Sequence, residues 1–185
     1  MARRAMLTAG RAVLLAGPTV LAFFTGGYFG GPRVWAGLVA WALVAVAMLT
    51  TRSPVPRRGA GRLAIAGLLG LGLWTLLSIT WAPIAGSAYD AGQLVMLYAG
   101  TLIASAALLQ GRVGARTVEP ALAAGTLIVI GYGLSNRLLP GVLHFSRSIS
   151  AQGRLEQPLT YWNAMGELAA LGFVLAARLA GDATR

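Results

Sequence analysis

The chain has 185 residues, of which 57% are hydrophobic and only 11% are charged, and its formal net charge is +10. Soluble domains contain roughly 25% charged residues, and a soluble chain of this length leaves about 30% of its unfolded surface exposed to water. So apolar a composition excludes a water-soluble globular fold, and we predict an integral membrane protein. The absence of cysteine also excludes disulfides and thiolate metal sites.

All of the basic residues are arginine. In a soluble protein such an excess of positive charge would indicate nucleic-acid binding, which needs a contiguous basic face. Here the arginines lie singly or in small groups between apolar runs, which is the pattern of membrane topology signals. We therefore predict the lipid bilayer as a partner and no nucleic acid.

Six apolar stretches are long enough to cross a membrane, since roughly 20 helical residues span the hydrocarbon core. The predicted spans are residues 12–29, 34–50, 63–81, 91–109, 118–139 and 161–179. The predicted fold is an all-α polytopic membrane helix bundle of about six transmembrane helices, forming a single transmembrane domain over residues 1–185.

The arginines also predict the orientation, because cytoplasmic connections are enriched in basic residues. With the N-terminus inside, the outer segments contain four arginines, which are Arg33, Arg137, Arg147 and Arg154. The cytoplasmic segments contain the other eleven, which are Arg3, Arg4, Arg11, Arg52, Arg57, Arg58, Arg62, Arg112, Arg116, Arg178 and Arg185. We predict a multi-pass protein of the cytoplasmic (plasma) membrane with both termini inside.

Most of the polar chemistry lies in residues 153–166, which read GRLEQPLTYWNAMG. The first part of this stretch is the end of the longest connection, an outer loop over residues 140–160. Loops of that length are commonly functional or disordered. Pro158 disfavours helix at Gln157, so we expect the last helix to begin between Leu159 and Tyr161. Arg154 and the backbone N–H groups of the first helical turn would then form an anion cradle facing outside.

Two further polar residues lie near this stretch. Glu167 follows Asn163 by one helical turn, on the same helix face and about 9 Å from the helix start. It either has a structured role or simply reaches water and the arginines above it. Arg137, near the outer end of the fifth span, either reaches the surface or turns toward the same outer pocket as Arg154. A single histidine and no lysine leave no metal pair and no phosphate-binding loop, so we predict neither a metal nor a cofactor.

Residues 153–172, GRLEQPLTYWNAMGELAALG, resemble the O-antigen ligase and polymerase-like family of membrane glycosyltransferases. Members of that family carry a sequence of the type Arg-x-x-Gly-Pro-x-Gly-Tyr-Trp-Asn-Ala-x-Gly as the chain enters a membrane helix. Gln157 and Thr160 stand where that pattern has its first and second glycines. Trp81-Ala-Pro followed by the span 91–109 is also similar to the earlier part of such chains.

The resemblance implies glycosyl transfer outside the membrane from a polyprenyl-pyrophosphate-linked saccharide, in cell-envelope polysaccharide assembly. Arg154 matches the arginine that contacts the pyrophosphate, and Asn163 matches the supporting asparagine. We predict pyrophosphate binding by Arg154, Asn163 and Arg137, with Glu167, Tyr161 and Trp162 in support, and we assign no catalytic residue.

The resemblance also bears on the extent of the chain. Family members carry a large outer loop later in the chain, with a further arginine and a histidine, and His144 precedes the motif and does not match that histidine. We therefore expect the N-terminal half of a longer protein, with a C-terminal half or another envelope-assembly protein as partner. Whether the chain is itself an enzyme stays open.

The alternative interpretation is a non-enzymatic six-helix membrane protein, such as a small transporter or an assembly partner. Transport predicts polar residues at the bilayer midplane or broken helices in symmetric positions. The polar residues of this chain instead cluster near the predicted outer face, which favours the first interpretation.

Overall fold

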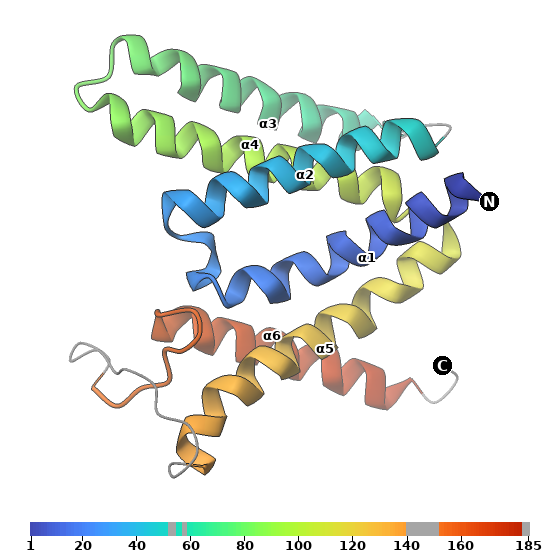
Figure 1. Ribbon diagram of the computed structural model, residues 1–185, viewed down its shortest axis with the longest axis vertical. Coiled ribbons are helices and arrows are strands. Elements are labelled where there is room, and N and C mark those ends of the chain that lie inside the picture. Colours follow the sequence, from blue (N-terminus) through green and yellow to red (C-terminus); the bar gives the residue numbers. More distant parts are fainter. Residues whose placement is uncertain (52–54, 57–58, 140–151, 183–185) are drawn as a thin grey trace. The chain divides into compact units, whose positions relative to one another are not determined.

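The computed structural model describes residues 1–51, 55–56, 59–139 and 152–182 (Figure 1). Over these residues the regular structure is entirely helical. The long helices are α1 (Ala2–Ala22), α2 (Gly30–Thr50), α3 (Gly59–Leu77), α4 (Ala85–Leu108), α5 (Gly111–Leu138) and α6 (Trp162–Gly181), and the short 3-10 helices are η1 (Thr25–Gly27) and η2 (Ser78–Thr80). Within the described ranges six helices are long and apolar enough to cross a membrane, so the predicted all-α, six-helix membrane fold is confirmed.

Several helices start earlier than the predicted spans. α1 begins at Ala2 instead of residue 12, α4 at Ala85 instead of residue 91, and α5 at Gly111 instead of residue 118. The predicted spans cover only the apolar residues of each stretch. The helices are longer because an established helix extends into its polar flanks at little cost. The predicted sixth span, 161–179, lies close to α6.

The C-terminal end of one predicted span is wrong. The span 12–29 ends at Ala22, because Thr25, Gly26 and Gly27 have φ angles of 55°, 65° and 76°. A right-handed helix cannot continue through left-handed residues, and glycine adopts that conformation readily. The span 63–81 ends close to its predicted position, since α3 continues into η2 and the apolar helical stretch reaches Thr80.

The contacts of the chain divide it into two compact units. Unit 1 comprises Met1–Leu14 and Tyr28–Ala115, and unit 2 comprises Leu15–Gly27 and Arg116–Arg185. Helices α1 and α5 each contribute residues to both units, and each unit has a buried apolar cluster of its own.

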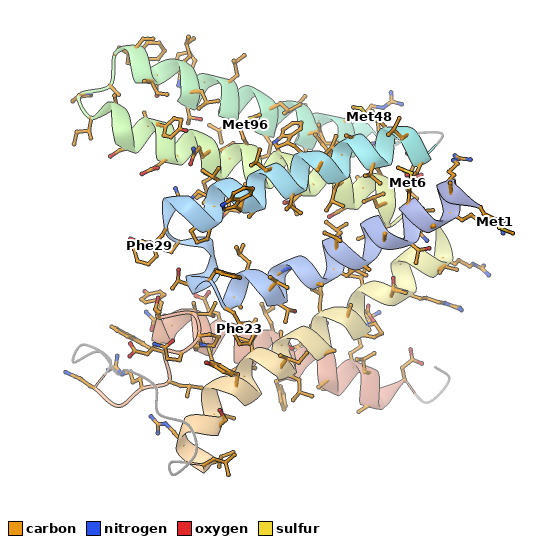
Figure 2. All side chains as sticks on the ribbon, viewed as in Figure 1. Met1, Met6, Phe23, Phe29, Met48 and Met96 are labelled. Carbon is orange, nitrogen blue, oxygen red and sulfur yellow. The ribbon has the colours of Figure 1, made fainter. Side chains whose placement is uncertain are left out.

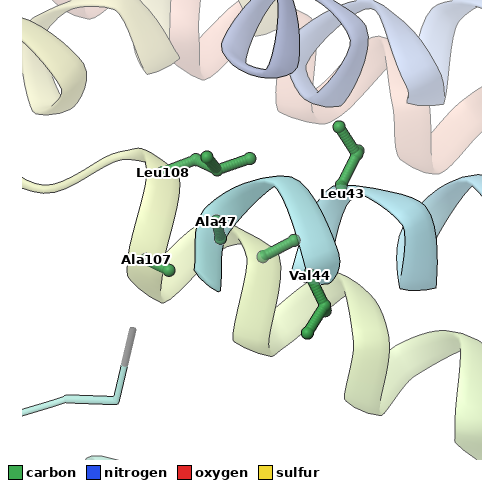
Figure 3. Packing of buried hydrophobic residues seen from close by; sticks show 6 residues of the cluster. Leu43, Val44, Ala47, Ala107 and Leu108 are labelled. Atoms are coloured by element: carbon green, nitrogen blue, oxygen red, sulfur yellow. The ribbon is translucent and has the colours of Figure 1, made fainter. Parts of the chain in front are cut away.

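The core of unit 1 lies between α2 and α4. Its buried residues are Leu43, Val44 and Ala47 of α2 and Ala104, Ala107 and Leu108 of α4 (Figure 3). Three of the six are alanine, and small side chains let membrane helices approach closely. The packing of α2 on α4 therefore depends on van der Waals contact between backbones more than on large side chains.

Helix α3 packs on α4 in an antiparallel register. A Cβ atom at Gly72 would lie 2.8 Å from the sulfur of Met96, which Figure 2 labels. One at Gly92 would lie 2.5 Å from Leu76 Cδ2. As the chain advances along α3 from residue 72 to 76, its partner on α4 moves back from residue 96 to 92. The start of α3 therefore lies opposite the end of α4.

Two arginines of α1 bind the C-terminal ends of other helices in unit 1. Arg3 Nε donates a hydrogen bond of 2.9 Å to the carbonyl of Thr50, at the end of α2. Arg11 donates from Nε to the carbonyl of Leu108 (2.6 Å) and from Nη2 to that of Gln110 (3.3 Å), at the end of α4. The last carbonyls of a helix have no intrahelical donor and carry partial negative charge. A guanidinium group supplies the missing donor and offsets that charge.

At the opposite end of unit 1, Arg33 joins the start of α2 to α4. Its Nη1 donates to the carbonyl of Asp90 at 3.2 Å and lies 3.9 Å from the Asp90 carboxylate, while Nη2 donates to the carbonyl of Tyr28. The Arg33 side chain is 13% exposed. This arginine therefore serves an internal connection in addition to the topology role assigned from the sequence.

Unit 2 combines the end of α1 with α5 and α6. Ala22, Val129 and Met165 form its buried cluster, and Phe23, labelled in Figure 2, packs edge to face on Tyr132 of α5, with ring centres 5.0 Å apart. Glycines allow close approach here too, since a Cβ at Gly172 of α6 would lie 2.9 Å from Thr126 Oγ1 of α5. Further along, Arg178 of α6 and Glu119 of α5 form an ion pair of 3.2 Å.

Candidate functional site

The segment from residue 152 to the start of α6 is the described part of the predicted outer loop. His144 and Arg147 lie outside the described residues. The segment is attached by apolar side chains, because Leu155 and Leu159 pack against the buried cluster of unit 2 and Pro158 is buried. Its polar residues are thus carried on a loop with apolar attachment points on both sides of Pro158.

Helix α5 provides the surface on which this loop rests. A Cβ atom at Gly133 would lie 2.5 Å from the carbonyl oxygen of Gln157, 3.1 Å from Met165 Cε and 3.3 Å from Leu155 Cδ2. Only a residue without a side chain permits that approach. Sequence reasoning did not single out Gly133, and nothing local distinguishes it from Gly131, which faces open space.

Arg154 lies over the first residue of α6. Its guanidinium carbon is 5.4 Å from the ring centre of Trp162, within the range of a cation–π contact. The side chain is exposed. The guanidinium group thus lies over the side chain of the first helical residue, and the backbone N–H groups of that first turn carry partial positive charge.

The start of α6 falls slightly after the predicted range of Leu159 to Tyr161. The helix begins at Trp162, and Tyr161 precedes it in an extended conformation with φ −140° and ψ 112°. The reason is Thr160, whose φ of 61° is left-handed and cannot form part of the helix.

Asn163 pairs with Tyr161 in the structure. Its Nδ2 donates a hydrogen bond of 2.9 Å to the Tyr161 hydroxyl, and the rings of Tyr161 and Trp162 lie 5.6 Å apart between centres. Asn163 therefore orients an aromatic neighbour, whereas the sequence interpretation had it supporting Arg154. Four of the predicted residues, Arg154, Tyr161, Trp162 and Asn163, come together by three side-chain contacts.

The other two predicted residues stand apart from this group. Glu167 is exposed on α6 one turn beyond Asn163, and Arg137 is exposed in the last turn of α5. Over the described ranges neither forms a hydrogen bond or an ion pair with Arg154. Glu156, which sequence reasoning did not single out, is a buried acid of the same loop with 6% of its surface exposed.

No group of three histidine, aspartate or glutamate side chains that could hold a metal ion occurs in the described part of the chain. The chemistry available at the loop is that of a guanidinium group, two aromatic rings, an amide and the N–H groups at a helix start. Such a set is suited to binding an anionic or amphipathic ligand.

Thr160 leads to a stability prediction. A β-branched residue at positive φ is strained, and a left-handed conformation costs an L-residue about 1–2 kcal/mol. Replacing Thr160 with glycine should raise the free energy of unfolding by about 0.5–1 kcal/mol. Relief of the strain is larger than the cost of ordering the more flexible glycine backbone, which is about 0.5–1 kcal/mol. Thermal unfolding in detergent measures this. Thr101→Gly, in the interior of α4, is the control and should destabilise, so a fall in stability for Thr160→Gly as well would contradict the prediction.

No family model, curated protein or solved structure matches this chain. The functional interpretation therefore depends on the residues and geometry of the loop and of the start of α6.

Proposed function

We propose that the chain binds a polyprenyl-pyrophosphate-linked saccharide through Arg154 and the first turn of α6, as a relative of the O-antigen ligase and polymerase-like membrane glycosyltransferases. The observation that carries the proposal is the Arg154 guanidinium carbon 5.4 Å from the ring centre of Trp162, at the helix start. The site would face the outside of the cytoplasmic membrane, on the orientation predicted from the arginine distribution.

The chemistry of these groups fits a pyrophosphate. Guanidinium groups donate paired hydrogen bonds to phosphate oxygens, and a helix N-terminus adds backbone donors with partial positive charge. The contact with Trp162 restricts the Arg154 side chain before binding, which lowers the entropy lost when a ligand is bound. Neutralising the pyrophosphate would also assist its departure as leaving group during glycosyl transfer.

The backbone at Thr160 also supports the resemblance. Its φ of 61° lies in the region that favours glycine, and the family pattern has glycine at the corresponding position. The loop thus adopts at Thr160 a conformation that the family's usual residue would take without strain.

The alternative is a non-enzymatic six-helix protein in which this group of side chains only anchors the helix at the membrane surface. Tyr161 is 51% exposed, and tyrosine and tryptophan are enriched at membrane–water interfaces. An anchor of this kind would interact with any lipid headgroup and would not discriminate between a phosphate and a pyrophosphate.

The experiment that separates the two compares lipids that differ in one phosphate. The native chain in nanodiscs of neutral lipid is titrated with undecaprenyl pyrophosphate and with undecaprenyl monophosphate, and bound lipid is counted by native mass spectrometry. A further charge-assisted hydrogen bond contributes about 1.5–3 kcal/mol, so we expect at least about tenfold tighter binding of the pyrophosphate. Equal affinities would exclude the proposed site and favour the anchor.

A further inference from the structure

The charges of unit 1 are segregated between its two ends. The only acidic residue in its sequence is Asp90, near the start of α4. Five arginines in the described part of unit 1 lie toward the other end, and we call this group the basic end: Arg3, Arg4, Arg11, Arg62 and Arg112.

The helix contacts bring these arginines together although they come from three helices, α1, α3 and α5. Arg3 and Arg11 of α1 donate to the C-terminal ends of α2 and α4. The antiparallel register of α3 on α4 places Arg62 opposite the end of α4, and Arg112 is the second residue of α5, just after α4 ends. Figure 1 shows the first residues of α1, α3 and α5 and the last residues of α2 and α4 at the same end of unit 1.

The positive charge at the basic end has no acidic counterpart within unit 1. Arg33, at the opposite end, lies 3.9 Å from the Asp90 carboxylate. Arg3 and Arg11 offset only the partial negative charge of two helix ends. The side chains of Arg4, Arg62 and Arg112 are exposed. Arg62 Nε donates to the carbonyl of Pro56 at 2.9 Å, and within the described part of unit 1 no acid compensates the exposed guanidinium groups.

Exposed apolar residues occur at the basic end as well, next to its arginines in sequence or at the helix end that Arg3 binds. Leu63 is 75% exposed beside Arg62, Val113 is 70% exposed beside Arg112, and Leu49 is 72% exposed near the end of α2 where Arg3 binds. A phospholipid presents the complementary pair, a phosphate above hydrocarbon. A soluble polyanion would match the arginines but would leave the apolar side chains in water.

From this arrangement we infer that the basic end binds the headgroup phosphates of anionic phospholipids, with Arg4, Arg62 and Arg112 as the contacting residues. The leucine and valine side chains next to them contact the upper part of the acyl chains. Basic residues gathered at the end of a membrane helix attract anionic headgroups, and each contributes separately. The inference is independent of the proposed pyrophosphate site, which belongs to unit 2.

The test uses the full chain in detergent, titrated with phosphatidylglycerol or phosphatidylcholine of identical acyl chains and followed by native mass spectrometry. The native chain should bind phosphatidylglycerol at least about fivefold more tightly than phosphatidylcholine. The double variant Arg4→Gln with Arg112→Gln should bind phosphatidylglycerol about tenfold more weakly than the native chain. Arg4→Lys with Arg112→Lys should restore most of it, because the interaction is with charge.

The matched control is Arg137→Gln with Arg178→Gln, which removes the same charge from unit 2. It should leave phosphatidylglycerol binding unchanged, and helical circular dichroism should show that both pairs of variants fold. An equal loss in the two pairs would mean that net charge alone governs binding, and the basic end would not be a site. The inference would also be overturned by equal binding of the two lipids, or by tighter binding of a single-stranded oligonucleotide than of phosphatidylglycerol.

Discussion

Replacing Arg154 with alanine is expected to lower the affinity of the chain for undecaprenyl pyrophosphate by about ten- to a hundredfold. Hydrogen bonds to charged groups contribute about 1.5–3 kcal/mol, and each 1.4 kcal/mol is about a factor of ten in the dissociation constant. The side chain is exposed and its contact with Trp162 lies within the loop and helix start. Its loss should therefore change binding much more than folding.

Three further variants identify the cause of that loss. Arg154→Lys keeps the charge but not the planar donor arrangement, so its affinity should be intermediate. Trp162→Leu removes the ring that restricts Arg154 and should cause a smaller loss. Arg4→Gln with Arg112→Gln, at the basic end of unit 1, should leave pyrophosphate binding unchanged, so this result also separates the two proposed sites. Unaltered binding by Arg154→Ala would contradict the proposed function.

Replacing Gly133 with alanine is expected to destabilise the protein by about 1–3 kcal/mol, the usual cost of an added methyl group in a packed contact. The new Cβ would lie 2.5 Å from the carbonyl oxygen of Gln157, a backbone atom that can move only with the loop. The loop should shift away from α5, so we also expect weaker pyrophosphate binding in this variant.

Gly131→Ala is the control, because it lies on the same helix and has nothing within 4 Å of its added Cβ. Alanine forms helix better than glycine by about 1 kcal/mol, so Gly131→Ala should be neutral or stabilising. Unfolding of both variants in mixed detergent, followed by circular dichroism, measures the difference. The two substitutions should have opposite signs, and a similar effect of both would show that Gly133 is not a packing contact.

Much of the candidate site was predictable because its residues are close in sequence. Arg154, Tyr161, Trp162 and Asn163 lie within one turn segment and one helix start, and Pro158 indicated approximately where that helix begins. Which of them touch was not predictable, since the pairs Arg154–Trp162 and Asn163–Tyr161 depend on side-chain torsions and on the left-handed Thr160. Asn163 was assigned to support Arg154, and in the structure it binds the Tyr161 hydroxyl.

The sequence by itself determined the fold class and the number of membrane helices, because hydrophobicity over roughly 20 residues is a local property and lipid requires helices to satisfy the backbone. Only the tertiary structure decided which arginines have an internal role. Arg33 meets Asp90 across 57 positions of sequence, and Arg11 meets Leu108 across 97. It also decided that Gly133 rests against a loop while Gly131 is open. Such contacts join segments far apart in the chain, and no local pattern records which side of a uniformly apolar helix will meet another.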